Sequence, residues 1–316
     1  MFDAKASLEL FHAVSSGDRD GIRAAALREA ERLRTGGADA AADEIVSLFP
    51  EGDQVPTGLY KLKPKKTFQQ LDLTPEVQQS IDDFLLEQRH VKELAEAGET
   101  PRHKALFIGP PGNGKTVLAG AVAIELGVPS YMVRYDDLIS NRPGETSRNL
   151  LQVFTYAARQ SCLLFFDEFD ALGRERDNDQ ESGEMKRVVS TLLVQLDDVP
   201  SHVVCIAATN HGQMLDAAIW RRFNIRIELP RPQITQFPAF MMELFQRRGY
   251  TPSDPDPDFD LEIVAYRCSF ENFSDSELFV SNCIRQKVLS GGTKTIEESI
   301  RAEVDKWSSS QRKVIV

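Results

Sequence analysis

From residue 67 onward, short runs of uninterrupted apolar residues alternate with longer segments in which apolar residues recur every three or four positions. The short runs predict strands at 104–108, 130–135, 162–166, 203–208 and 225–229. The longer segments predict helices at 75–97, 115–126, 145–159 and 184–196. Strands without polar alternation are typical of a parallel sheet that is covered on both faces. The pattern therefore predicts a doubly wound α/β fold with a parallel sheet.

The two ends of the chain show helical periodicity only. Before residue 50, apolar stripes near 8–14, 22–33 and 41–48 predict three short helices. After residue 230, the predicted helices span 233–248, 259–268, 274–289 and 295–307. We therefore expect an N-terminal helical module at 1–49, a linker at 50–66, an α/β domain at 67–230, and a small helical domain with a C-terminal helix at 231–316.

Composition and charge narrow the class of protein. The 316 residues carry a net charge of −11, which disfavours non-specific binding to a nucleic-acid backbone. The four cysteines include no CxxC pair, so we expect reduced thiols in a cytoplasmic protein. The strongest apolar run, 162–166, is too short to span a bilayer, and no leader is evident at the N-terminus. We expect no membrane partner.

A glycine-rich segment lies between a predicted strand and a predicted helix. It matches the phosphate-loop pattern GxxxxGK[ST] and comprises Gly109, Pro110, Pro111, Gly112, Asn113, Gly114, Lys115 and Thr116. Glycines let backbone N–H groups turn inward around phosphate oxygens, and the helix N-terminus favours the same anion. Lys115 provides a charge for the β- and γ-phosphates, and the Thr116 hydroxyl is a predicted Mg²⁺ ligand. The segment therefore predicts binding of ATP with Mg²⁺.

Polar residues follow two later strands of the predicted sheet, 162–166 and 203–208. Asp167 and Glu168 follow the strand at 162–166, at the strand end where α/β sheets bind ligands. We expect Asp167 to hold Mg²⁺ and Glu168 to polarise the water that attacks the γ-phosphate. Asn210 follows the strand at 203–208, and its amide is able to orient that water; an ordinary turn asparagine is the alternative.

Two adjacent arginines follow a short predicted helix at Arg221 and Arg222. They fit either a solvated basic edge or an arginine finger that reaches the nucleotide of a neighbouring subunit. A guanidinium stabilises the charge of a phosphoryl group in transfer, an effect worth about 10³–10⁵ in rate. These motifs together predict hydrolysis of ATP at a site shared between subunits.

The segments GPPGNGKT, LLFFDEFDAL, IAATN and LDAAIWRRF occur in this order, and together they resemble the AAA branch of the AAA+ ATPases. The resemblance covers about residues 67–289 and implies a helical lid after the α/β domain and a ring, with six subunits as the family expectation. It implies that Asn210 is the first sensor, that Arg222 is the preferred finger and that Arg221 is the second choice. Ile225 occupies the usual position of a second finger, and Arg226 lies one residue beyond it.

Other segments depart from the resemblance. Where members that thread polypeptides place an aromatic pore residue, this chain has Arg142, followed by Pro143. An arginine prefers carboxylates, phosphates or aromatic faces to apolar side chains, so threading of unfolded chains is a weaker expectation. Residues 173–180 would form a second pore loop of mixed charge, or an exposed polar loop.

The chain also resembles a narrower group of bacterial ATPases that are encoded beside a subtilisin-like serine protease, some of which act in phage defence. The variants at 144–146, 167–172 and 220–223 carry this similarity. The primary expectation is an oligomeric ATPase that remodels or regulates a protein partner. The alternatives are a nucleotide-dependent assembly switch without threading, and a nucleic-acid motor that uses Arg142 and the lysines between residues 61 and 66.

Overall fold

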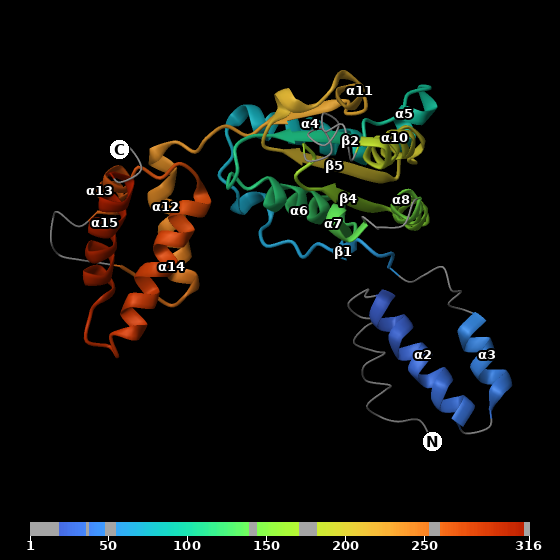
Figure 1. Cartoon of the computed structure of the whole chain (residues 1–316), viewed down its shortest axis with the longest axis horizontal. Helices are drawn as coiled ribbons and strands as arrows, with labels where there is room; N and C mark the ends of the chain where they lie inside the picture. Colours follow the sequence, from blue (N-terminus) through green and yellow to red (C-terminus); the bar gives the residue numbers. More distant parts are fainter. Residues whose placement is uncertain are drawn as a thin grey trace. The chain divides into compact units, whose positions relative to one another are not determined.

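A computed structural model describes residues 19–35, 38–47, 55–138, 144–170, 182–252 and 260–312 (Figure 1). The chain divides into two compact units, Met1–Pro56 and Thr57–Val316. Within the described residues, no helix combines the length and the apolar character needed to cross a bilayer.

The first unit contains two helices that pack against each other, α2 (Arg19–Thr35) and α3 (Asp39–Ser47). Ala42 of α3 is buried, whereas Ala41, which the apolar pattern placed on the packed face, is exposed. The helix predicted near residues 8–14 lies outside the described residues.

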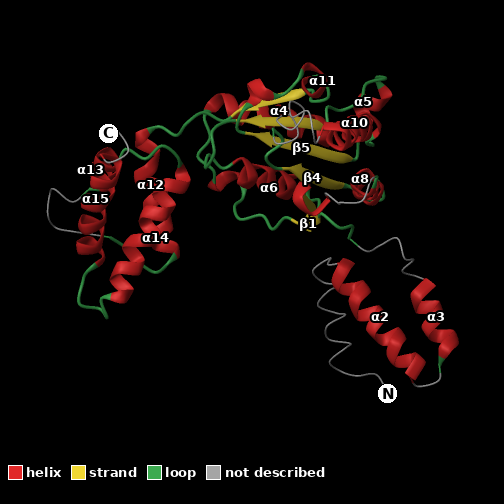
Figure 2. Ribbon diagram, in the orientation of Figure 1, coloured by secondary structure: helices red, strands yellow, loops and turns green. Residues whose placement is uncertain are grey.

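The second unit is built on a six-stranded sheet with the order β1-β3-β4-β5-β2-β6 (Figure 2). The strands are β1 (Leu59–Lys61), β2 (Lys104–Ile108), β3 (Ser130–Val133), β4 (Cys162–Phe166), β5 (Val203–Thr209) and β6 (Ile225–Glu228). Strands β2 to β6 pair in parallel, and only β1 is antiparallel, at the edge beside β3. The prediction of a parallel α/β sheet is confirmed. The order places β2 between β5 and β6, which brings residues after β2 beside residues after β5.

Seven α-helices accompany the described strands of this sheet. They are α4 (Pro75–Arg89), α5 (Val91–Glu96), α6 (Lys115–Leu126), α7 (Tyr135–Leu138), α8 (Glu145–Ala157), α10 (Ser182–Asp198) and α11 (Ala217–Trp220). The single helix predicted at 75–97 is two helices, because His90 leaves the helical region with φ −111° and ψ 32°. The strand predicted at 130–135 ends at Val133, and Tyr135 instead begins α7.

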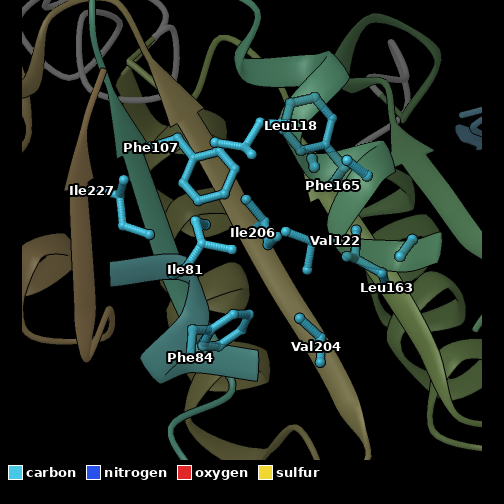
Figure 3. Close-up of a cluster of buried hydrophobic side chains, with 14 of the residues drawn as sticks. Ile81, Phe84, Phe107, Leu118, Val122, Leu163, Phe165, Val204, Ile206 and Ile227 are labelled. Atoms are coloured by element: carbon cyan, nitrogen blue, oxygen red, sulfur yellow. The ribbon is translucent and has the colours of Figure 1, made fainter. Parts of the chain in front are cut away.

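The larger hydrophobic core lies between the sheet and the pair α4 and α6 (Figure 3). Ile81 of α4 and Leu118 of α6 point toward Phe107 of β2 and Ile206 of β5, and Phe84 of α4 lies below Ile81 on the side of Val204. All of these side chains are buried. Burial of one such side chain stabilises the fold by about 1.5–3 kcal/mol. This packing fixes the start of α6 against the end of β2, where the phosphate-loop segment lies.

The opposite face of the sheet is covered as well. Phe166 of β4 stacks on Phe154 of α8 with ring centroids 5.9 Å apart, and Phe169 meets Phe223 edge to face at 5.4 Å. Helices α8 and α10 contact each other over this side. With both faces covered, every residue of β4 and β5 is buried, which explains why these strands carry no polar alternation.

Four helices after the sheet enclose a second hydrophobic core. They are α12 (Phe237–Arg247), α13 (Leu261–Cys268), α14 (Phe273–Leu289) and α15 (Ile296–Arg312). Phe245, Phe279 and Ile300 are fully buried in this core. Lys66, which lies between β1 and α4, contacts these helices, since its Nζ lies 2.9 Å from Glu243 Oε2 and 5.0 Å from the ring centroid of Phe240.

The segment 50–66, expected from its composition to be a linker, therefore carries strand β1 and the Lys66 contact in its second half. The sequence did not predict this edge strand, because three residues with one buried side chain leave almost no periodic signal.

All four cysteines are buried free thiols. Burial raises the pKa of Cys162 and of Cys268 to about 12, and it raises the pKa of Cys205 and of Cys283 as well. These thiols therefore stay protonated near neutral pH and pack as small apolar side chains.

Candidate active site

The phosphate-loop segment spans the end of β2 and the first turn of α6, as its pattern predicts. Gly112 and Gly114 have φ angles of 77° and 83°, in the left-handed region that glycine reaches at little cost. At Gly109 an added Cβ would lie 2.4 Å from the carbonyl oxygen of Leu229, so the backbones approach too closely for a side chain. The glycines are thus required for the observed path of the loop.

Lys115 is buried at the start of α6 and is 7% exposed. Its Nζ donates hydrogen bonds to the carbonyl oxygens of Gly109 and Pro110, at 2.7 and 2.9 Å, and to Asn210 Oδ1 at 2.7 Å. Burial lowers the pKa of Lys115, and the carboxylates of Asp167 and Asp170 oppose that shift. The ammonium is therefore held inside the loop by neutral oxygens, which an anionic ligand can replace.

Thr116 and Asp167 meet across the gap between α6 and the end of β4. Thr116 Oγ1 lies 3.1 Å from Asp167 Oδ2, and the other carboxylate oxygen accepts the backbone N–H of Glu168 at 3.0 Å. Mg²⁺ binds through one or two protein oxygens together with substrate phosphates. A hydroxyl and a carboxylate in contact beside a phosphate loop fit that requirement.

Glu168 stands out in its backbone conformation. Its φ of 48° lies in the left-handed region, and the only other described non-glycine residue with positive φ is Ser269. The side chain of Glu168 is exposed, and it has no hydrogen bond or ion pair within the described part of the chain. A left-handed glutamate costs about 1–2 kcal/mol, and such strain concentrates at functional sites.

The end of β5 joins the same site. Asn210 contacts Lys115 through its side-chain oxygen, and its backbone N–H lies 3.3 Å from Asp170 Oδ1. Thr209 donates its hydroxyl to the same Asp170 oxygen at 2.9 Å. The structure thus brings Lys115, Thr116, Asp167 and Asn210 together at the carboxyl edge of the sheet, where α/β folds bind ligands.

Asn113 ties the loop to the segment after β6. Its Nδ2 donates to the carbonyl oxygen of Pro230 at 2.7 Å, whereas its buried Oδ1 has no hydrogen-bond partner within the described residues. Gly112 faces Asn272, the N-cap of α14, whose Oδ1 would lie 2.6 Å from a Cβ added at Gly112. The loop is therefore enclosed on two sides by residues that follow the sheet in sequence.

The arginines lie apart from these contacts. Arg222 donates to Asp197 Oδ2 at 2.8 Å and to the carbonyl oxygen of Ala218 at 2.9 Å. Arg226 lies over the ring of Trp220, 4.8 Å from its centroid. Arg221 is exposed and makes no side-chain hydrogen bond or ion pair to the residues that the structure describes. These side-chain contacts of Arg222 and Arg226 are thus to residues outside the phosphate loop.

The two predicted pore segments, Arg142 and residues 173–180, lie outside the described residues.

Two further residues at the site received no role from the sequence. Asp170 lies within the LLFFDEFDAL segment. The feature of the sequence that could have identified it is an acidic residue between two apolar residues, three positions after Asp167. Tyr135 stacks on Phe166, with centroids 6.4 Å apart, and its buried hydroxyl has no hydrogen-bond partner among the residues described. Burial and the carboxylate of Asp167 raise the pKa of Tyr135 well above its ordinary value. Tyr135 lies outside the motif segments, and Asp170 lies within one of them at a position that the motif patterns leave without a task.

A glycine-built loop before a helix, a buried lysine within it, and a threonine paired with an aspartate on the neighbouring strand end define a P-loop nucleoside triphosphatase domain. Comparison with known proteins narrows this class. Residues 105–231 match the model of the ATPase family associated with various cellular activities (AAA). Residues 105–231 of this chain are thus similar to the ATPase domains of the AAA family.

Three relatives show the range of this similarity. The chain is 38% identical over 202 residues to an uncharacterized AAA family ATPase, y4kL, of Sinorhizobium fredii, covering 64% of this chain and 61% of the relative. It is 29% identical over 249 residues to the ATP-dependent zinc metalloprotease FtsH 3 of Sphaerobacter thermophilus, covering 77% and 50%. It is 32% identical over 224 residues to the peroxisomal ATPase pex6 of Schizosaccharomyces pombe, covering 68% and 23%. The matched region therefore spans about three-fifths or less of the length of these relatives.

Proposed function

We propose that the whole protein is a Mg²⁺-dependent AAA ATPase that assembles into a ring, with six subunits as the family expectation, and that remodels or regulates a protein partner. The contact of Lys115 Nζ with Asn210 Oδ1 at 2.7 Å carries the ATPase part of the proposal, because it joins the phosphate loop to the residue that follows β5. The name of one relative, an ATP-dependent zinc metalloprotease, supports a partner that is a protein.

Each residue of the site has a proposed task. Lys115 exchanges its bonds to loop carbonyls for bonds to the β- and γ-phosphates of ATP, and the loop N–H groups bind the remaining phosphate oxygens. Thr116 and Asp167 would hold Mg²⁺, which when bound neutralises phosphate charge. Glu168 accepts a proton from the attacking water, and the Asn210 amide orients that water against the γ-phosphate.

We propose that an arginine of the pair Arg221 and Arg222 completes the site of a neighbouring subunit. The sequence resemblance favours Arg222, but the ion pair with Asp197 must break before that guanidinium can reach another chain. Arg221 is exposed and has no such pair within the described residues, and this favours Arg221 as the finger.

A mixing experiment separates the two arginines. Arg221→Ala or Arg222→Ala subunits are titrated against Glu168→Gln subunits, and phosphate release is measured at fixed total protein. An arginine that acts in trans leaves binding of ATP intact, abolishes hydrolysis in the pure variant, and gives partial recovery in the mixture. Hydrolysis that stays near the unmixed wild-type rate in both single variants would refute a shared site.

The identity of the partner is also a proposal. The resemblance to ATPases encoded beside a subtilisin-like serine protease leads us to propose such a protease as the partner, with phage defence as the setting. Sequencing of the flanking genes, then co-expression with any subtilisin-like protease gene found there and protease assays with ATP and with Glu168→Gln protein, tests this. Protease activity that is independent of the ATPase and its nucleotide state would contradict it.

The nucleic-acid motor is a weaker alternative. Lys66, one of the lysines on which it depended, is already paired with Glu243 and stacked on Phe240, and its side chain is 11% exposed. Retention on immobilised DNA or RNA across a salt gradient tests this alternative, because phosphate contacts weaken steeply with salt.

The assembly switch predicts instead that Arg142→Ala leaves ring assembly and partner-stimulated turnover unchanged.

A further inference from the structure

Asp170 lies three residues after Asp167 and is buried, with 5% of its surface exposed. Its Oδ1 accepts two hydrogen bonds from the end of the neighbouring strand. The donors are the Thr209 hydroxyl, at 2.9 Å, and the backbone N–H of Asn210, at 3.3 Å. A carboxylate is rarely buried unless its charge is compensated or hydrogen-bonded, so this position is built to hold the strand end.

The hydrogen bonds of the Asp170 side chain lie just beyond the last backbone hydrogen bonds between the β4 and β5 segments. Strands β4 and β5 are paired up to Phe166 and Ala207, and one further backbone bond runs from the N–H of Phe169 to the oxygen of Ala208 at 2.8 Å. Beyond that point, no described backbone bond joins the two segments. The side chain of Asp170 therefore takes over the alignment of the two strand ends.

The alignment continues to the phosphate loop through short contacts. Thr209 is fully buried, and its Oγ1 also accepts the backbone N–H of His211 at 3.0 Å. The side chain of Asn210 accepts a hydrogen bond from Lys115 at 2.7 Å. A continuous series of contacts thus runs from Asp170 through Thr209 and Asn210 to Lys115.

We propose that Asp170 is a positioning residue for ATP hydrolysis, which holds the end of β5 so that the Asn210 amide stays aligned with Lys115 and the γ-phosphate. The inference rests on the proposed role of Asn210. It assigns Asp170 no contact with ATP or Mg²⁺, because its Oδ1 is engaged by Thr209 and Asn210.

This role predicts a loss in kcat without an equal loss in nucleotide affinity. Removal of Asp170 leaves the buried Thr209 hydroxyl and the Asn210 N–H without this acceptor, so the strand end must shift to find new partners. A displacement of about 1 Å of a positioning group costs about 10²-fold in rate. The phosphate loop is built separately by its glycines and Lys115, so binding of ATP should persist.

The test uses the full chain and four variants. Asp170→Ala removes the acceptor, and Thr209→Ser retains the hydroxyl. Thr209→Val removes, at nearly constant volume, the hydroxyl that donates to Asp170 and accepts from His211. Ser299→Ala is the matched control, because Ser299 is a fully buried residue of α15 whose hydroxyl donates to the oxygen of Thr295, far along the chain from the site. For each variant, kcat, KM for ATP, the Kd of a fluorescent ADP analogue and the melting temperature are measured.

We expect Asp170→Ala and Thr209→Val to lower kcat at least ten-fold while KM and Kd stay within about three-fold of wild type. Thr209→Ser should stay within about three-fold in kcat, and Ser299→Ala should match wild type. If Asp170→Ala does not fold, the contrast of Thr209→Val with Thr209→Ser decides alone. Unchanged kcat in Thr209→Val, an equal loss of affinity and kcat, or a similar loss in Ser299→Ala overturns the inference.

Failure of this inference differs from failure of the proposed function. If wild-type protein hydrolyses ATP, and kcat is lowered in Asn210→Ala but not in Thr209→Val, only the proposed role of Asp170 is refuted. If Asn210→Ala hydrolyses ATP as well as wild type does, the role of Asn210 falls, and the inference from Asp170 falls with it.

Discussion

Glu168 permits a test that separates backbone strain from chemistry. Its φ of 48° costs an L-residue with a long side chain about 1–2 kcal/mol relative to an ordinary conformation. Glycine avoids that cost, but it loses more conformational entropy on folding, about 0.5–1 kcal/mol. The net change for Glu168→Gly is therefore a stabilisation of about 0.75 kcal/mol, within a range of about 0–1.5 kcal/mol. Glu168→Gln keeps the Cβ and the strain, and it should leave the free energy of unfolding unchanged.

The two variants should agree in activity and differ in stability. Both lack the carboxylate that the proposed mechanism needs, so both should lose hydrolysis. In nucleotide-free thermal unfolding, a gain of 1 kcal/mol corresponds to about 2–4 °C for a domain of 150–250 residues, so Glu168→Gly should melt about 1–4 °C above Glu168→Gln. Phosphate release and melting are measured on the same preparations.

Ser269 provides the matched control, since it is the other described non-glycine residue with positive φ, at 46°. It is exposed at the C-cap of α13, and we assign it no role in the site. Ser269→Gly should raise the melting temperature by a smaller amount, because it also removes the hydrogen bond from the Ser269 hydroxyl to the Tyr266 oxygen, and it should leave hydrolysis unchanged. If Ser269→Gly is stabilised and Glu168→Gly is not, Glu168 is unstrained. If Glu168→Gly or Glu168→Gln hydrolyses ATP at the wild-type rate, Glu168 is not the base.

Two further predictions concern affinity and pH. Lys115→Ala removes at least one charged hydrogen bond to phosphate beyond the loop N–H groups, worth about 1.5–3 kcal/mol each, so a titration with fluorescent ATP analogue should show a loss of at least ten-fold in affinity; unchanged affinity would contradict the loop assignment. The hydrogen bonds from Arg102 to Glu87 lower the pKa of that carboxyl from its ordinary value of 4.5. The resulting stabilisation is present above about pH 4.5 and is lost as the pH falls through the lowered pKa. Because both side chains are partly exposed, Glu87→Gln should cost less than about 1 kcal/mol at pH 7 and less at pH 3 than at pH 7, as measured by urea unfolding at each pH. An equal cost at both pH values would show that the charge on Glu87 is irrelevant.

The sequence alone determined the motifs whose chemistry is local. The glycines at 109–114 and the ends of β2, β4 and β5 are readable because backbone freedom and uninterrupted apolar runs leave a signal within a few residues. Residues of the phosphate loop and the acids after β4 could therefore be identified as site candidates from residue types and spacing. Boundaries of helices were less readable, as the break at His90 shows, because a turn of backbone there needs no special residue type.

The tertiary structure decided what depends on residues far apart in the chain. Asp170 and Thr209 are 39 positions apart, and only the pairing of β4 with β5 makes them neighbours. The ion pair of Arg222 with Asp197 likewise depends on how α10 packs beside the segment after α11, and no local pattern encodes it. Local sequence thus specifies which groups the site contains, whereas strand order and helix packing specify which of them touch, because these contacts form only when the distant segments share one core.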